Sequence, residues 1–136
     1  MKKLAVIILA MFMLTACGQS KGDSNMTENQ TAPTGVYRNI TAQEAKQIMD
    51  TQQGYVILDT RAQDEYDESH IPGAILIPHD EITEKAEGVL TDKDQLILVY
   101  CRSGRRSKLA AEALQKLGYT NILEFGGIID WPYEVE

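Results

Sequence analysis

One cysteine stands between an apolar segment and a helical pattern, in the run Cys101-Arg102-Ser103-Gly104-Arg105-Arg106-Ser107. A strand, a tight loop and a helix in succession direct free backbone N–H groups and the positive end of the helix dipole at the loop. Such groups and nearby cations lower the pKa of a thiol and favour the nucleophilic thiolate. We therefore expect Cys101 to be a nucleophile. The expected anion-binding residues follow it: Arg102, Ser103, Gly104, Arg105, Arg106 and Ser107.

Less reactive interpretations of the same run remain open. Cys101 is alternatively a buried structural thiol, or an inactive residue of a binding module. Side chains of successive residues diverge, so the three arginines cannot all face one ligand, and one of them is expected to be solvated. The acidic residues 64–65, 67–68 and 81–87 are expected on ordinary solvated faces.

The elements that must position the cysteine follow from hydrophobic periodicity. Residues 96–100 form a continuous apolar run, which is typical of a buried parallel strand. Apolar residues from 109 to 117 recur at helical spacing, and Gly118 is placed to end that helix. A capping box at residues 41–44 predicts a helix that Gly54 ends. Further strands are expected near 36–38 and at 55–58, 74–77 and 121–125, the last stopped by Gly126-Gly127, and further helices at 64–68 and 80–87.

Alternating strands and helices predict an α/β fold, with a parallel central sheet of about five strands and helices on both faces. Ligands of such sheets bind beyond the carboxyl ends of the strands, where both Cys101 and the segment 59–61 fall. Asp59 and Arg61 are expected to support this carboxyl-end rim of the sheet through an ion pair or backbone contacts. His70 is expected in a turn and Trp131 in the core. His79 and Asp80 make no recognisable ligand set, so no metal is expected.

The N-terminal segment has the pattern of a targeting sequence. Lys2 and Lys3 precede an apolar stretch, 4–14, that is shorter than the roughly 20 residues of a membrane-spanning helix. The following Leu14-Thr15-Ala16-Cys17 resembles the lipobox of bacterial lipoproteins. That resemblance implies a signal peptide at 1–16, a lipid on Cys17 and an extracytoplasmic protein anchored to a bacterial membrane by lipid alone. A plain secretory signal and a buried helix are the alternatives.

Composition limits the partners and the redox chemistry. Residues 17–35 are rich in Gly, Ser, Asn, Thr and Gln, as in a flexible tether, which leaves 36–136 as the folded domain. The formal net charge of −7 argues against a nucleic-acid partner, and the cationic loop against this acidic background favours a small anionic ligand. With Cys17 lipidated, Cys101 would have no disulfide partner within the chain. We expect a monomer.

Three motifs in order resemble the single-domain rhodaneses, which are sulfurtransferases that carry sulfur as a cysteine persulfide. They are Leu58-Asp59-Thr60-Arg61 with Glu65-Tyr66 and His70-Ile71-Pro72-Gly73-Ala74, the cysteine loop 101–107, and Gly126-Gly127 with Trp131. The resemblance spans about 40–131. Ser69 and Leu76 depart from the family pattern, in which glycine and asparagine are usual at these positions.

This resemblance implies a rhodanese-like fold and transfer of sulfane sulfur from a thiosulfate-like donor to a thiol or cyanide acceptor, through a Cys101 persulfide and without a cofactor. A non-enzymatic binding or redox-sensing module is the alternative. A cysteine phosphatase is a third possibility. Cysteine phosphatases place five residues between the cysteine and the phosphate-binding arginine, whereas Arg106 follows only four and Ser107 stands at the phosphatase arginine position.

Overall fold

The structure, a computed structural model, describes residues 37–136. The expected signal peptide 1–16, the lipidated Cys17 and the tether 17–35 lie outside the described residues. The elements in chain order are β1 (Arg38–Asn39), α1 (Ala42–Thr51), β2 (Tyr55–Asp59), α2 (Gln63–Glu68), β3 (Ile75–Leu76), α3 (Ile82–Val89), β4 (Leu96–Cys101), α4 (Arg105–Lys116), β5 (Ile122–Gly127) and the 3₁₀ turn η1 (Ile128–Asp130).

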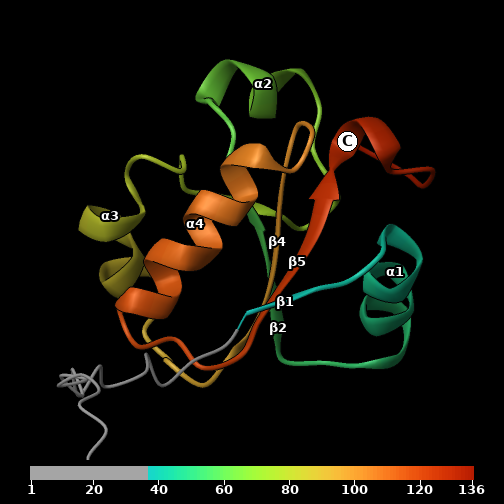
Figure 1. Ribbon diagram of the computed structural model, residues 1–136. Coiled ribbons are helices and arrows are strands. Elements are labelled where there is room, and N and C mark those ends of the chain that lie inside the picture. Colours follow the sequence, from blue (N-terminus) through green and yellow to red (C-terminus); the bar gives the residue numbers. More distant parts are fainter. Residues whose placement is uncertain (1–36) are drawn as a thin grey trace, which may run out of the picture. The chain divides into compact units, whose positions relative to one another are not determined.

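The five strands form one parallel sheet in the order β1-β5-β4-β2-β3, so the strand that ends in Cys101 is central (Figure 1). The predicted α/β fold with a parallel five-stranded sheet is confirmed. Asp59 pairs with Tyr100 and Gly127 pairs with Cys101. The ends of β2 and β5 therefore flank the cysteine at one edge of the sheet.

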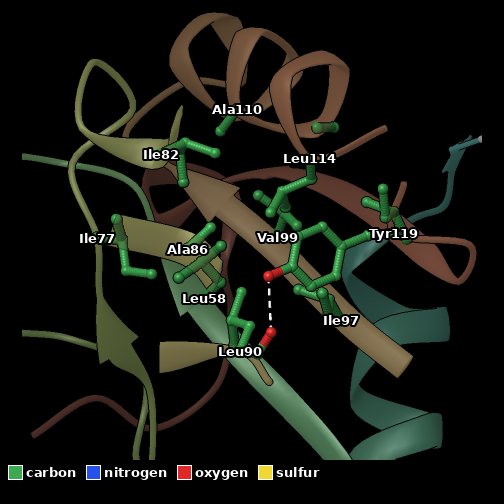
Figure 2. Close-up of a cluster of buried hydrophobic side chains, with 12 residues drawn as sticks. Leu58, Ile77, Ile82, Ala86, Leu90, Ile97, Val99, Ala110, Leu114 and Tyr119 are labelled. Atoms are coloured by element: carbon green, nitrogen blue, oxygen red, sulfur yellow. Dashed lines mark hydrogen bonds between the residues drawn. The ribbon is translucent and has the colours of Figure 1, made fainter. Parts of the chain in front are cut away.

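Helices cover both faces of the sheet, with α3 and α4 on one side and α1 on the other (Figure 1). Alternate β4 residues face opposite cores: Ile97 and Val99 pack with α3 and α4 (Figure 2), whereas Leu98 and Tyr100 pack on the α1 side. All four side chains are fully buried. Burial of each large apolar side chain contributes about 1.5–3 kcal/mol, so β4 is anchored on both faces immediately before the cysteine.

Two helix ends follow the local sequence signals. The Glu44 N–H donates to Thr41 Oγ1 at 3.1 Å and the Thr41 N–H donates to Glu44 Oε2 at 2.7 Å, which is the predicted capping box. At the end of α4, Gly118 has a φ of 91° and the Tyr119 N–H donates to the Leu114 carbonyl at 3.1 Å, as in a Schellman motif. The prediction that Gly54 ends α1 was wrong by three residues, because the helix ends at Thr51.

The prediction that Gly126-Gly127 stops the last strand was also wrong, because β5 continues through both glycines. Gly126 has a φ of 88°, and the β4–β5 register shifts between Val99 and Cys101. At Gly127 a Cβ atom would overlap the Arg102 carbonyl. The glycine pair therefore lets β5 bend and pass directly beneath the cysteine loop, which a side chain at Gly127 would push away.

Other boundaries of strands and helices also differ from the predicted ones. β4 extends one residue further than expected, so Cys101 closes the strand. β1 lies at Arg38–Asn39, and β3 is limited to Ile75–Leu76. α3 begins at Ile82, not Asp80, because the preceding residues turn and the Glu81 N–H donates to the Pro78 carbonyl at 2.9 Å. Within residues 37–136, no helix has both the length and the apolar composition needed to cross a bilayer.

Candidate functional site

The Cys101 thiol lies at the base of a very short connection between β4 and α4. Only residues 102–104 separate the strand from the helix. Gly104 has a φ of 102°, a conformation that glycine adopts without strain, and its N–H donates to Cys101 Sγ at 3.0 Å. Cys101 is 1% exposed. The backbone of the loop thus points a donor at the sulfur, in the manner expected of an anion-binding turn.

Burial and hydrogen bonding shift the pKa of the Cys101 thiol in opposite directions. Burial raises the pKa of Cys101, but hydrogen bonds to the sulfur, among them those from the N–H groups of Ser107, Gly104 and Ser103, outweigh it, so the pKa lies below its ordinary value. The positive end of the α4 dipole favours the same charged form. The site therefore stabilises a thiolate.

The three arginines of the loop have different environments. Both Nη atoms of Arg106 donate to the Glu65 carboxylate, at 2.6 and 2.7 Å, which joins α4 to α2. This bond lowers the pKa of Glu65 to about 2. Arg102 and Arg105 are exposed and form no ion pair within residues 37–136. The expectation that Glu65 lies on an ordinary solvated face was wrong, because it holds one of the loop arginines.

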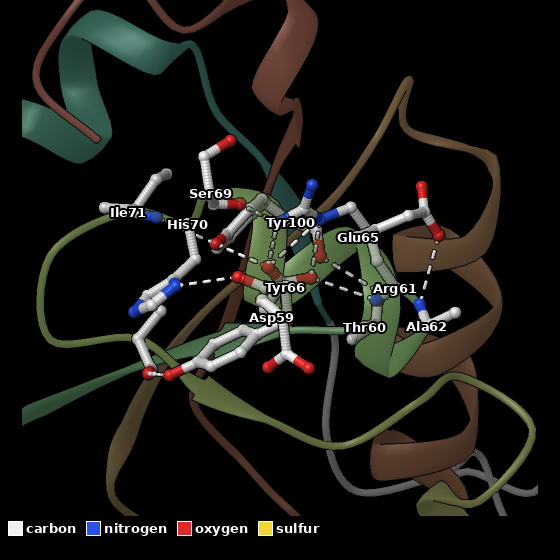
Figure 3. A network of polar contacts seen from close by, with 12 residues as sticks. Asp59, Thr60, Arg61, Ala62, Glu65, Tyr66, Ser69, His70, Ile71 and Tyr100 are labelled. Atoms are coloured by element: carbon white, nitrogen blue, oxygen red, sulfur yellow. Dashed lines mark hydrogen bonds and ion pairs between the residues drawn. The ribbon is translucent and has the colours of Figure 1, made fainter. Parts of the chain in front are cut away.

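Asp59 and Arg61 form the expected ion pair behind the rim (Figure 3). Asp59 is fully buried, and it accepts hydrogen bonds from the Arg61 Nη2 at 2.6 Å and from the Tyr100 hydroxyl at 2.7 Å. Arg61 Nη2 also donates to the Ser69 carbonyl at 2.7 Å, and the Ile71 N–H donates to the Tyr100 hydroxyl at 3.1 Å. The pair thereby fixes the turn between β2 and β3 against the central strand.

His70 and Trp131 have packing roles. His70 stacks on Tyr66 with ring centroids 3.8 Å apart, and its Nδ1 lies 2.9 Å from the Tyr66 carbonyl oxygen. Trp131 is 8% exposed and belongs to the core on the α1 side. The cysteine loop contains neither residue.

Sequence reasoning missed one buried carboxylate next to the loop. Glu124, in β5, is 2% exposed, and its Oε1 accepts hydrogen bonds from the Ser107 hydroxyl at 2.6 Å and the Gly126 N–H at 2.9 Å. The available signal was a single acidic residue inside an otherwise apolar strand segment, 122–125. Ser107, expected to bind substrate, is thus engaged with the sheet.

Comparisons with known proteins agree with this fold. The family model described as "Rhodanese-like domain" matches residues 41–132. The chain is 38% identical over 73 residues to the thiosulfate sulfurtransferase PspE of Escherichia coli strain K12, covering 54% of this chain and 70% of that protein. It is 33% identical over 117 residues to YrkF of Bacillus subtilis strain 168, covering 85% of this chain, and it spans 60% of the length of YrkF. A solved structure titled "rhodanese with anions from E. coli" superposes with a TM-score of 0.57 at 34% identity, over 60% of this chain and 96% of that one.

Proposed function

This chain belongs to the rhodanese family, and we propose that it transfers sulfane sulfur from a thiosulfate-like donor to a thiol or cyanide acceptor through a persulfide on Cys101. The observation that carries the proposal is the pairing of a thiol of lowered pKa with a backbone donor, the Gly104 N–H, 3.0 Å from its sulfur. The relative named as a thiosulfate sulfurtransferase supports the choice of donor.

The reaction requires two displacements at sulfur. The Cys101 thiolate attacks the outer sulfur of thiosulfate, a new S–S bond forms, and the bond to the sulfonate sulfur breaks with its electron pair leaving on sulfite. An acceptor thiolate or cyanide then attacks the outer sulfur of the persulfide, which releases the Cys101 thiolate. Covalent catalysis of this kind replaces one transfer by two displacements, and the stabilised thiolate is both nucleophile and leaving group.

Charge and backbone donors define the roles of the other loop residues. Arg102 and Arg105, which are exposed, attract the dianionic donor to the edge of the sheet. N–H groups from Ser103, Gly104 and Ser107 stabilise the charged sulfur. Arg106, bound by Glu65, holds the first turn of α4 in place.

The persulfide is the direct test of this chemistry. After incubation of the full chain with thiosulfate and removal of the excess, intact mass spectrometry is expected to show a gain of one sulfur atom that a thiol acceptor or cyanide removes. Cys101→Ser, which retains Cys17, is the matched control and is expected to show no gain. A wild-type protein that gains no sulfur, or a control that gains it equally, contradicts the proposal.

We propose further that the domain works outside the cytoplasm, attached to the membrane by a lipid on Cys17. The basic residues, the apolar stretch 4–14 and the run 14–17 support this location. Cells grown with a labelled fatty acid are expected to incorporate label into the wild-type protein but not into Cys17→Ala. Equal labelling of the two proteins contradicts the anchor.

A further inference from the structure

Glu124 is a buried acid that pairs with no cation of residues 37–136. It is 2% exposed, and no Lys, Arg or His nitrogen of residues 37–136 lies within 4.0 Å of its carboxylate oxygens. Burial of a carboxylate is costly unless hydrogen bonds or a cation compensate it. The recorded donors to Glu124 are the Ser107 hydroxyl and the Gly126 N–H, so this carboxylate is held by the cysteine loop and the glycine pair.

The Ser107 hydroxyl has one proton and several acceptors within reach. Its Oγ lies 2.6 Å from Glu124 Oε1, 3.0 Å from the Gly104 carbonyl oxygen and 3.3 Å from the Gly126 carbonyl oxygen. A hydrogen bond from this hydroxyl to the Cys101 sulfur would lower the pKa of the thiol. Hydrogen bonds to a carboxylate are shorter and stronger than those to a neutral carbonyl. The short distance to Glu124 therefore assigns the proton to the carboxylate.

We propose that Glu124 is a positioning residue of the sulfur-transfer site: its carboxylate binds the Ser107 hydroxyl proton and so withholds this hydroxyl from the Cys101 thiolate. The thiolate is then stabilised by backbone N–H groups of the loop. This inference rests on the proposed function for its catalytic meaning, but not for its test.

Four of the other charged groups near Cys101 form two ion pairs. From α4 and α2 they are Arg106 and Glu65, and from the end of β2 they are Asp59 and Arg61. Arg102 and Arg105 add positive charge from the loop itself. β5 contributes Glu124, whose negative charge disfavours a thiolate nearby. Both effects of Glu124, its charge and its hold on Ser107, thus oppose excessive stabilisation of the thiolate.

The effect of Glu124 on the Cys101 pKa also affects how fast the thiolate attacks sulfur. The nucleophilicity of a thiolate falls as its pKa falls, and an attacking thiol works best when its pKa lies near the ambient pH. The N–H donors of the loop, the helix dipole and the exposed Arg102 and Arg105 all lower the thiol pKa. Glu124 limits that fall, which keeps Cys101 reactive toward sulfur.

The pH profile of Cys101 alkylation tests the proposal. The full chain is treated with iodoacetamide across a pH series, and labelling of the peptide that contains Cys101 is followed by mass spectrometry. Glu124→Gln keeps the oxygen Oε1 that accepts both the Gly126 N–H and the Ser107 hydroxyl but loses the charge, so it holds the hydroxyl less strongly and the thiolate competes for its proton. We expect the midpoint of the profile to fall by about half a pH unit or more. Glu112→Gln, an exposed change on α4, is the matched control and leaves the midpoint unchanged.

Ser107→Ala separates the hydroxyl from the charge. Because the wild-type hydroxyl is bound to Glu124, its removal alone is expected to move the midpoint by less than about half a pH unit. In this background Glu124→Gln is expected to lower the midpoint by less than it does in the wild type. An unchanged or raised midpoint in Glu124→Gln, an equal fall in both backgrounds, or a rise of half a unit or more in Ser107→Ala overturns the proposal.

The readouts also keep this inference apart from the proposed function. Alkylation needs no sulfur donor, so a wild-type protein that forms no persulfide contradicts the function without altering the profile. If Glu124→Gln does not fold, as judged by circular dichroism, the Ser107→Ala midpoint decides the question alone.

Discussion

Two arginine–carboxylate pairs support the same edge of the sheet in different ways. The Asp59–Arg61 pair joins residues two apart, with side-chain exposures of 0% and 5%. The Glu65–Arg106 pair joins residues 41 apart on two helices, with exposures of 25% and 21%. The first lies in the protein interior and the second lies at its boundary with water.

Because of this difference in burial, the two pairs are expected to contribute differently to the stability of the fold. A buried charge depends on its partner, because removal of that partner leaves an uncompensated ion. When a partly exposed pair breaks, water solvates both charges, so the pair contributes less to stability. We infer that the first pair maintains the turn after β2, and that the second sets the position of the start of α4 relative to α2.

The largest effect is expected from breaking the buried pair. Asp59→Ala strands the buried Arg61 guanidinium and removes the acceptor of the Tyr100 hydroxyl, so the free energy of unfolding is expected to fall by about 3–5 kcal/mol. Urea unfolding measures this change. The double variant Asp59→Ala/Arg61→Leu, which removes the stranded charge, is expected to recover part of the loss. A loss below about 1 kcal/mol would contradict the distinction between the pairs.

A smaller effect, dependent on pH, is expected from the boundary pair. The pKa of Glu65 is lowered from 4.5 to about 2, chiefly by the hydrogen bond from Arg106. A lowered pKa contributes stability that is present above the unfolded value and is lost as the pH falls from 4.5 toward 2. Because both side chains are partly exposed, this contribution is about 1–2 kcal/mol.

The variant Glu65→Gln isolates that contribution. The difference in unfolding free energy between the wild type and Glu65→Gln is expected to be constant near neutral pH and to shrink between pH 4.5 and about 2. Chemical denaturation at several pH values measures it. A difference that does not change over this range would show that Glu65 is not held in its charged form.

The smallest effect on stability is expected from an arginine that belongs to neither pair. Arg105 is exposed, so Arg105→Gln is expected to change the free energy of unfolding by less than about 0.5 kcal/mol. Loss of a charge near the donor is expected to raise the KM for thiosulfate roughly fivefold, since an exposed charge contact contributes about 1 kcal/mol. Steady-state kinetics at low and high salt measure this change, and the difference between the proteins is expected to narrow as salt rises. An unchanged KM at low salt would remove Arg105 from donor binding.

Local patterns were sufficient to predict the elements and the place of the cysteine. The apolar run before Cys101, the helical spacing after it and the caps at Thr41 and Gly118 depend on residues within a few positions of one another. Such patterns report on backbone conformation and burial directly. The ion pair of Asp59 and Arg61 was equally predictable from the sequence, because its members are two residues apart.

The errors next to the cysteine loop arose where distant segments meet. Gly127 is required by the Arg102 carbonyl, and Gly126 by the bend in β5, so the strand continues through both glycines and ends only at Gly127. Nothing near either residue in sequence indicates that contact. A glycine pair in isolation predicts a turn.

The sequence alone therefore determined the order of strands and helices, the parallel sheet and the position of one thiol between a strand and a helix, because these follow from short-range periodicity. Only the tertiary structure decided which arginine is bound by Glu65, and that Glu124 holds Ser107 across 17 residues. Those choices depend on the register of β4 and β5 and on the packing of α2 and α4, which bring together side chains that no local pattern links.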